Sequence, residues 1–170
     1  MQNIETLSNR VKEYLDSQEW HYSFDNEKRM FKFGMGTKTK MKNIDIIIKI
    51  RENSIIAYGM PRISADTETM SVAVEYIARA NYGLVIGNFE IDCSDGELRY
   101  KSSIYCKDDV PSLDVVKYIV ELPILMWKIY GDGLLACLFA GSSPEEEIKK
   151  LEMNSGHMCN PSSPRDNPLQ

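Results

Sequence analysis

Imidazole bases and histidine metal ligands are scarce in this chain. Its 170 residues contain only two histidines, His21 and His157. His21 stands between Trp20 and Tyr22, so it alternates outward from an aromatic strand, and His157 falls in a polar C-terminal stretch. A hydrolytic triad would have to use His21 as its base. We interpret His21 instead as a surface histidine.

The cysteines are spaced too widely for a zinc or redox motif. They are Cys93, Cys106, Cys137 and Cys159, and no CxxC pair exists. If Cys93 lies opposite Leu98 in a hairpin, Cys106 is roughly 27 Å further along the strand at about 3.4 Å per residue. A disulfide requires Cα atoms within about 7 Å of each other. We therefore expect reduced, mostly buried thiols.

Acidic and glycine-rich stretches offer no better chemistry. An acidic cluster consists of Glu90, Asp92, Asp95 and Glu97. It lacks the spacing of an EF-hand loop. Pairing across a hairpin assigns Asp92 and Glu90 to Arg99 and Lys101, and the turn accounts for Asp95. Gly131-Asp132-Gly133 and Gly34-Met35-Gly36 lack the context of a phosphate-binding loop. We predict no enzyme activity, no catalytic residue, no cofactor and no metal site.

A lysine-rich loop is the feature most compatible with nucleic acid. Lys38, Lys40 and Lys42 follow Phe31 and Phe33, and aromatic rings beside basic residues can bind RNA. The phenylalanines, however, alternate toward the core, and the net charge of −5 argues against nucleic acid as the main partner. We favour a solvated loop. An RNA- or nucleotide-associated regulator using the Lys38–Lys42 loop is the alternative.

The elements that position these residues segregate into strands and helices. Hydrophobic periodicity and capping residues predict helices over 3–17, from about 64 to 82, from 111 through 130 with a kink at Pro123, and over 143–152. Alternating apolar residues and turn residues predict strands on either side of residues 25–28, over 44–50 and 55–60, and within 87–106. This order predicts an α+β fold with an antiparallel sheet of about five to six strands and helices on one face. We expect one domain over residues 1–153 and a disordered tail over 154–170.

One hairpin has a register that its own residues suggest. An Asp95-Gly96 turn sets Glu90 opposite Lys101 and Asp92 opposite Arg99 on one face. The same register pairs apolar residues on the other face, namely Ile91 with Tyr100 and Cys93 with Leu98. We therefore predict a two-residue turn.

The isoleucine-rich hairpin is apolar on both faces. A turn at Glu52-Asn53 sets Ile50 opposite Ile55 and Ile48 opposite Ala57. The second face then carries Ile47, Ile56, Tyr58 and Met60 beside Lys49 and Asp45. Either the register is wrong, or a helix covers this face, or it is a contact surface for a partner or a second copy of the chain. We assign the four apolar residues as candidate partner-binding residues.

The longest apolar stretch does not suit a membrane. It runs from Tyr118 to Phe139, and Glu121, Pro123, Lys128 and Gly131-Asp132-Gly133 interrupt it. No signal-peptide pattern opens the chain, because Met1 leads into a polar amphipathic helix. We expect a soluble cytoplasmic protein with no membrane partner.

Three segments resemble a known family. They are NYGLVIGNFEIDCSDGELRYKSSI at residues 81–104, the isoleucine-rich hairpin ending in YGMP at 58–61, and GSSPEEEIKKLE at 141–152. Together they resemble the YbjN domain family, described as bacterial sensory transduction regulators, over about residues 3–152. The resemblance implies a type III secretion chaperone-like fold and no established catalytic residues. Gly131-Asp132-Gly133 and the extra tail depart from the family pattern.

We therefore predict a non-enzymatic protein-binding or regulatory, chaperone-like module that acts through protein–protein contacts. The resemblance also implies homodimerisation, because the secretion-chaperone-like fold commonly works as a homodimer. Neither the partner nor the pathway follows from the residues.

Overall fold

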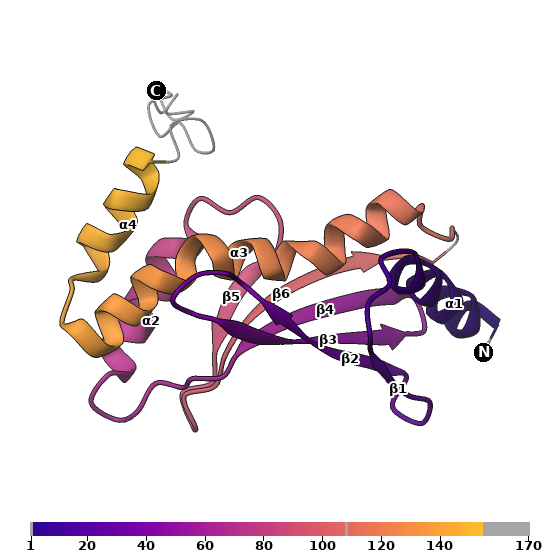
Figure 1. The fold of residues 1–170 in the computed structure, drawn as a ribbon, viewed down its shortest axis with the longest axis horizontal. Coiled ribbons are helices and arrows are strands. Elements are labelled where there is room, and N and C mark those ends of the chain that lie inside the picture. Colours follow the sequence, from indigo (N-terminus) through magenta and orange to yellow (C-terminus); the bar gives the residue numbers. More distant parts are fainter. Residues whose placement is uncertain (1, 108, 155–170) are drawn as a thin grey trace, which may run out of the picture.

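The computed structural model describes residues 2–107 and 109–154, and over that part of the chain it is an α+β fold (Figure 1). The elements follow the order α1 (Gln2–Ser17), β1 (Ser23–Asp25), β2 (Met30–Gly36), β3 (Asn43–Arg51), β4 (Ser54–Pro61), α2 (Met70–Asn81), β5 (Asn88–Ile91), β6 (Leu98–Tyr105), α3 (Leu113–Ala140) and α4 (Pro144–Asn154). The predicted fold class and element order are confirmed. Residues 155–170, which include most of the predicted tail with His157 and Cys159, lie outside the described residues.

The strands form one antiparallel sheet. Its order is β1-β2-β3-β4-β6-β5, so β6 returns beside β4 and leaves β5 at the edge. The two edge strands are short, with three residues in β1 and four in β5. Short edges offer few unpaired backbone groups to another strand. The broad faces of the sheet are therefore its main surfaces.

The helices cover one face of this sheet. Ile44, Ile46 and Ile48 alternate along β3 and are fully buried beneath them. The long helix α3 crosses the strands, and α1, α2 and α4 pack beside it (Figure 1). One hydrophobic cluster contains the inward strand residues and the buried helix residues. The molecule is therefore two-layered, with its core between the sheet and the helices.

Pro123 lies in the middle of α3 without ending it. Proline has no backbone N–H, so the carbonyl one turn earlier, that of Ile119, loses its helical donor. The hydroxyl of Ser102, which is buried in β6, donates to the Ile119 oxygen at 2.7 Å. A sheet side chain thus satisfies the acceptor that the proline leaves open.

The same helix is fixed to β4 at Gly59. The indole Nε1 of buried Trp127 donates to the Gly59 oxygen at 2.8 Å. A Cβ at position 59 would lie 2.8 Å from Cβ of Pro123 and 3.1 Å from Cδ1 of Trp127. Only glycine therefore allows the helix to approach the sheet this closely.

Gly131 and Gly133 do not end α3, although the sequence predicts this helix only through residue 130. The helix continues to Ala140 and ends at Gly141, which has a φ of +69°. A Cβ at Gly133 would lie 2.6 Å from the Tyr76 hydroxyl, and one at Gly131 would lie 3.1 Å from Met41. The two glycines admit α2 and the loop before β3, so tertiary packing offsets their low helix propensity.

The predicted register of the β5–β6 hairpin is wrong by two residues. Glu90 lies opposite Arg99 and Ile91 opposite Leu98. A two-residue turn of the expected type requires positive φ at both Asp95 and Gly96, and only Gly96 has it, at +75°. The loop is longer, and the Asp92 carboxylate accepts hydrogen bonds from the backbone and hydroxyl of Ser94 instead of meeting Arg99.

We expect Ser102→Ala to destabilise the protein by about 1–3 kcal/mol, because it leaves the buried Ile119 carbonyl without a donor. Urea denaturation measures this loss. Ser103→Ala is the matched control, since Ser103 is exposed on the other face and should change little.

A double variant tests whether Pro123 is the reason that the Ile119 carbonyl depends on Ser102. Pro123→Ala restores a backbone N–H that can bond to Ile119, so the loss from Ser102→Ala should shrink in the Pro123→Ala background. Equal losses in both backgrounds would show that the proline is not the reason for the hydrogen bond.

Candidate protein-binding face

The register of the β3–β4 hairpin is confirmed. Ile50 lies opposite Ile55 and Ile48 opposite Ala57, with Arg51 opposite Ser54 at the turn. The register error considered as an explanation for the second apolar face is therefore excluded.

The four candidate residues lie on the sheet face opposite the helices. Ile47 is paired with Tyr58 across the two central strands, and Ile56 and Met60 flank Tyr58 along β4. All four are half-buried, and none belongs to the hydrophobic core cluster or packs against it. Among the described residues no helix covers this face, which we call the open face.

Long cationic side chains account for part of this burial. The Lys49 ammonium lies 5.5 Å from the centre of the Tyr58 ring, and the Arg99 guanidinium lies 5.0 Å from it. Lysine and arginine cover apolar surface with their stems while their charges stay in water, and both cations interact favourably with the ring. The open face is thus an apolar centre partly covered by long charged side chains.

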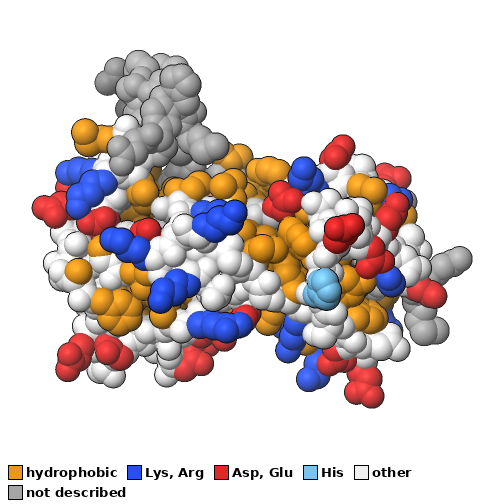
Figure 2. Space-filling model, in the orientation of Figure 1, with side chains coloured by type: hydrophobic (Ala, Val, Ile, Leu, Met, Phe, Trp, Pro, Cys, Tyr) orange, Lys and Arg blue, Asp and Glu red, His pale blue; other side chains and the backbone are white. Residues whose placement is uncertain are grey.

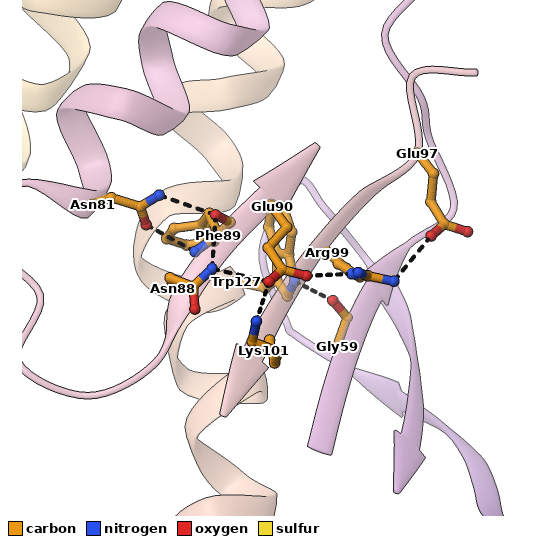
Figure 3. Close-up of polar contacts among 9 residues, drawn as sticks. All are labelled: Gly59, Asn81, Asn88, Phe89, Glu90, Glu97, Arg99, Lys101 and Trp127. Carbon is orange, nitrogen blue, oxygen red and sulfur yellow. Dashed lines mark hydrogen bonds and ion pairs between the residues drawn. The ribbon is translucent and has the colours of Figure 1, made fainter. Parts of the chain in front are cut away.

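A carboxylate anchors the cations at the β5–β6 side of the face (Figure 3). Glu90 accepts a hydrogen bond from Arg99 Nε at 2.6 Å and another from Lys101, and the Asn88 amide donates to it at 3.2 Å. Burial raises the pKa of the Glu90 carboxyl, but the hydrogen bonds from Lys101 and Arg99 outweigh this effect, so its pKa is lowered. Glu90 therefore stays ionised and holds Arg99 and Lys101 beside Tyr58.

The edge strand that carries Glu90 is fastened to α2. The Asn81 amide donates to the Phe89 carbonyl at 3.0 Å and accepts from the Phe89 N–H at 2.8 Å (Figure 3). The Phe89 ring packs edge-on against Trp127, with ring centroids 5.0 Å apart. The helical layer thereby fixes the position of the charged corner of the open face.

The helical side has a groove that the sequence did not reveal. It has a volume of about 470 Å³ between α3, β2 and the segment after α1. Figure 2 shows hydrophobic side chains gathered in a hollow on this side of the molecule. Tyr118 and Leu125, 50% and 45% exposed, lie along its wall with Trp20. Because Tyr118 and Leu125 are seven residues apart, they lie on the same face of a helix, and this spacing could have indicated the groove. The other apolar residues of α3 hide that pattern in the sequence.

The lysine loop is built as expected. Lys38, Lys40 and Lys42 are exposed, whereas Phe31 and Phe33 are buried in the core. The phenylalanine rings are therefore not available to stack on bases. The loop itself is held by Met41, whose N–H donates to Asp132 on α3 at 3.3 Å.

The described residues contain no evident catalytic constellation. No group of three or more His, Cys, Asp or Glu side chains among them is placed to hold a metal ion. His21 is exposed, as predicted. Of the three described cysteines, Cys106 and Cys137 are buried and free, whereas Cys93 is free but exposed in the hairpin loop.

One described helix, α3, is long and apolar enough to cross a membrane by length and composition alone. Of its most apolar window, 56% is buried inside the structure. The core helix of a soluble protein meets the same two criteria, and α3 packs across the sheet, so its apolar character is accounted for by the core.

Comparison with solved structures finds a protein of the same fold. The crystal structure of YbjN from E. coli, a proposed transcription regulator, aligns over 91% of this chain and 96% of its own length, with a TM-score of 0.51 and 12% sequence identity. At that identity the likeness shows a YbjN-like fold alone. No protein-family model matches the chain, and no curated protein matches it in sequence.

We expect Glu90→Gln to lower the free energy of unfolding by about 0.5–1 kcal/mol at neutral pH, since a half-exposed ion-pair network contributes modestly. The folded-state pKa of Glu90 is lowered, so this contribution is present above its unfolded pKa and is lost as pH falls through the folded pKa. Urea denaturation at several pH values should show the variant and the unmodified protein converging in acid.

Glu97→Gln is the control for that experiment. Glu97 is 3.8 Å from Arg99 and more exposed, so its replacement should have little effect at any pH. A Glu90→Gln loss that persists unchanged in acid would contradict the ion-pair explanation.

Proposed function

We propose that this chain is a non-enzymatic regulatory module of the cytoplasm that binds a protein partner through its open face. The observation that carries the proposal is the cluster of Ile47, Ile56, Tyr58 and Met60 outside the core, on a sheet face that no described helix covers. Antiparallel sheets with helices on one side commonly present a polar second face to water. An apolar centre at that position suits a contact surface.

The energetics are sufficient for binding. If a partner buries about 300 Å² of apolar surface on the open face, roughly 7 kcal/mol of transfer free energy opposes the cost of association. The flanking lysine and arginine chains supply the polar rim typical of protein interfaces.

The YbjN-like fold is compatible with a regulatory role, because the E. coli protein of that fold is described as a proposed transcription regulator. We infer that the chain is a distant member of the YbjN family, with the chaperone-like mode of action that the three sequence segments imply. A homodimer formed through the open face is the alternative to a separate protein partner on the same surface.

An RNA- or nucleotide-associated regulator is the second candidate function. The observation in its favour is the loop that presents Lys38, Lys40 and Lys42 to solvent, with no ion pair to these lysines among the described residues. The burial of Phe31 and Phe33 weakens it. RNA binding by this route would be steeply salt-dependent and lost in Lys38→Glu/Lys40→Glu.

We expect Ile56→Glu to abolish capture of the partner in affinity purification from the native host, followed by mass spectrometry. Leu125→Glu places the same charge in the helical groove and should leave capture intact. Circular dichroism and thermal melting confirm that both variants are folded, and Ile47→Gln replaces Ile56→Glu if that variant unfolds. Capture lost only in Leu125→Glu would move the binding site to the groove.

Light scattering of the unmodified protein tests the homodimer. A dimer that becomes monomeric in Tyr58→Glu with the fold retained supports self-association through the open face. A monomer at tens of micromolar excludes it.

A further inference from the structure

The charges of the open face differ in sign from those of the whole chain. The outward positions of the six strands carry five cationic side chains, namely Lys32, Lys49, Arg51, Arg99 and Lys101. They carry three carboxylates, namely Asp25, Asp45 and Glu90. The chain as a whole has 20 lysines and arginines against 25 acids. The open face is therefore a cationic surface on an acidic protein.

The carboxylates of this face are already paired. Asp45 accepts a bidentate contact from Arg62, with the shortest distance 2.7 Å, and Glu90 holds Arg99 and Lys101. Asp25, at the edge strand, lies 3.9 Å from Lys28. The acids therefore neutralise cations at the margins of the face and leave its centre positive.

The cations without an acidic partner lie beside the apolar residues. Lys32 is directly opposite Ile47, and Lys49 is directly opposite Ile56. Lys32, Lys49 and Arg51 make no ion pair with any described residue. Positive charge and apolar surface are thus interleaved across the neighbouring strands β2, β3 and β4.

Building on the proposed function, we propose that the partner of the open face is an acidic protein segment whose carboxylates flank apolar side chains. Its apolar residues pack on Ile47, Ile56 and Met60, and its carboxylates meet Lys32, Lys49 and Arg51. Complementary charge speeds encounter and rejects basic or neutral competitors.

Two other occupants fit this face less well. Single-stranded nucleic acid binds by stacking successive bases on several exposed aromatic rings. The Tyr58 ring already has Lys49 and Arg99 beside it, and the exposed Tyr105 ring lies at the end of β6, opposite Ser54. The remaining residues at the centre are aliphatic. A two-fold contact with a second copy would bring the positive centres of two identical faces together, which opposes association.

Binding of designed fluorescent peptides to the full chain tests the proposal. One peptide alternates leucine with glutamate, a second alternates leucine with lysine, and a third keeps the glutamates but replaces leucine by serine. Anisotropy should show binding of the first peptide alone, weakened by high salt. Lys32→Glu/Lys49→Glu should weaken that binding by about tenfold or more, since it reverses two charges at the site.

The matched control is Lys38→Glu/Lys40→Glu, which makes the same charge change in the loop outside the face and should leave peptide binding unchanged. Equal binding of the first two peptides, or no loss in Lys32→Glu/Lys49→Glu, overturns the acidic-segment inference. If Ile56→Glu still abolishes capture from the host in that case, the proposed function stands without it. Competition by an oligouridylate RNA for the face, or a dimer formed through it, also overturns the inference.

Discussion

The position of α3 on the sheet depends on how a proline inside a helix is compensated. Pro123 removes one backbone donor, and Ser102 supplies another from β6. One turn further on, Trp127 donates to Gly59 of β4, where the absence of a side chain permits close contact. These two buried hydrogen bonds tie α3 to adjacent strands. Because α1, α2 and α4 pack around α3, the helical layer and the core depend on them.

The consequence for function is that the four helices of the described residues lie on one side of the sheet. Glu90 and its cations are held in place from behind, through Asn81 and the ring contacts of Phe89 with Trp127. The open face is thus presented by a backbone that the core fixes, while its own side chains remain outside that core. A backbone fixed by the core, with apolar and charged side chains exposed on it, suits the proposed recognition of another protein.

Sequence reasoning identified the element order. It also identified the β3–β4 register, because the alternating isoleucines fix which side chains share a face and the Glu52-Asn53 turn fixes the pairing. It failed on the β5–β6 register because a shift of two residues keeps every side chain on the same face, so alternation cannot detect it. The low helix propensity of Gly131 and Gly133 suggested that the helix ends before them. Their close packing against Met41 and Tyr76, which allows the helix to continue, is visible only in the folded structure. Sequence also proposed the apolar second face, but only the assembled layers show which face the helices cover.

The two-residue period of the strands separates folding from recognition in this molecule. Along β3 and β4, successive side chains alternate between the core and the open face. The inward residues must pack in the core, whereas the outward residues do not. Mutations at the outward positions can accumulate without repacking the interior. Sequence change on this face can therefore leave the scaffold intact, and this chain and the E. coli YbjN share one fold at 12% sequence identity.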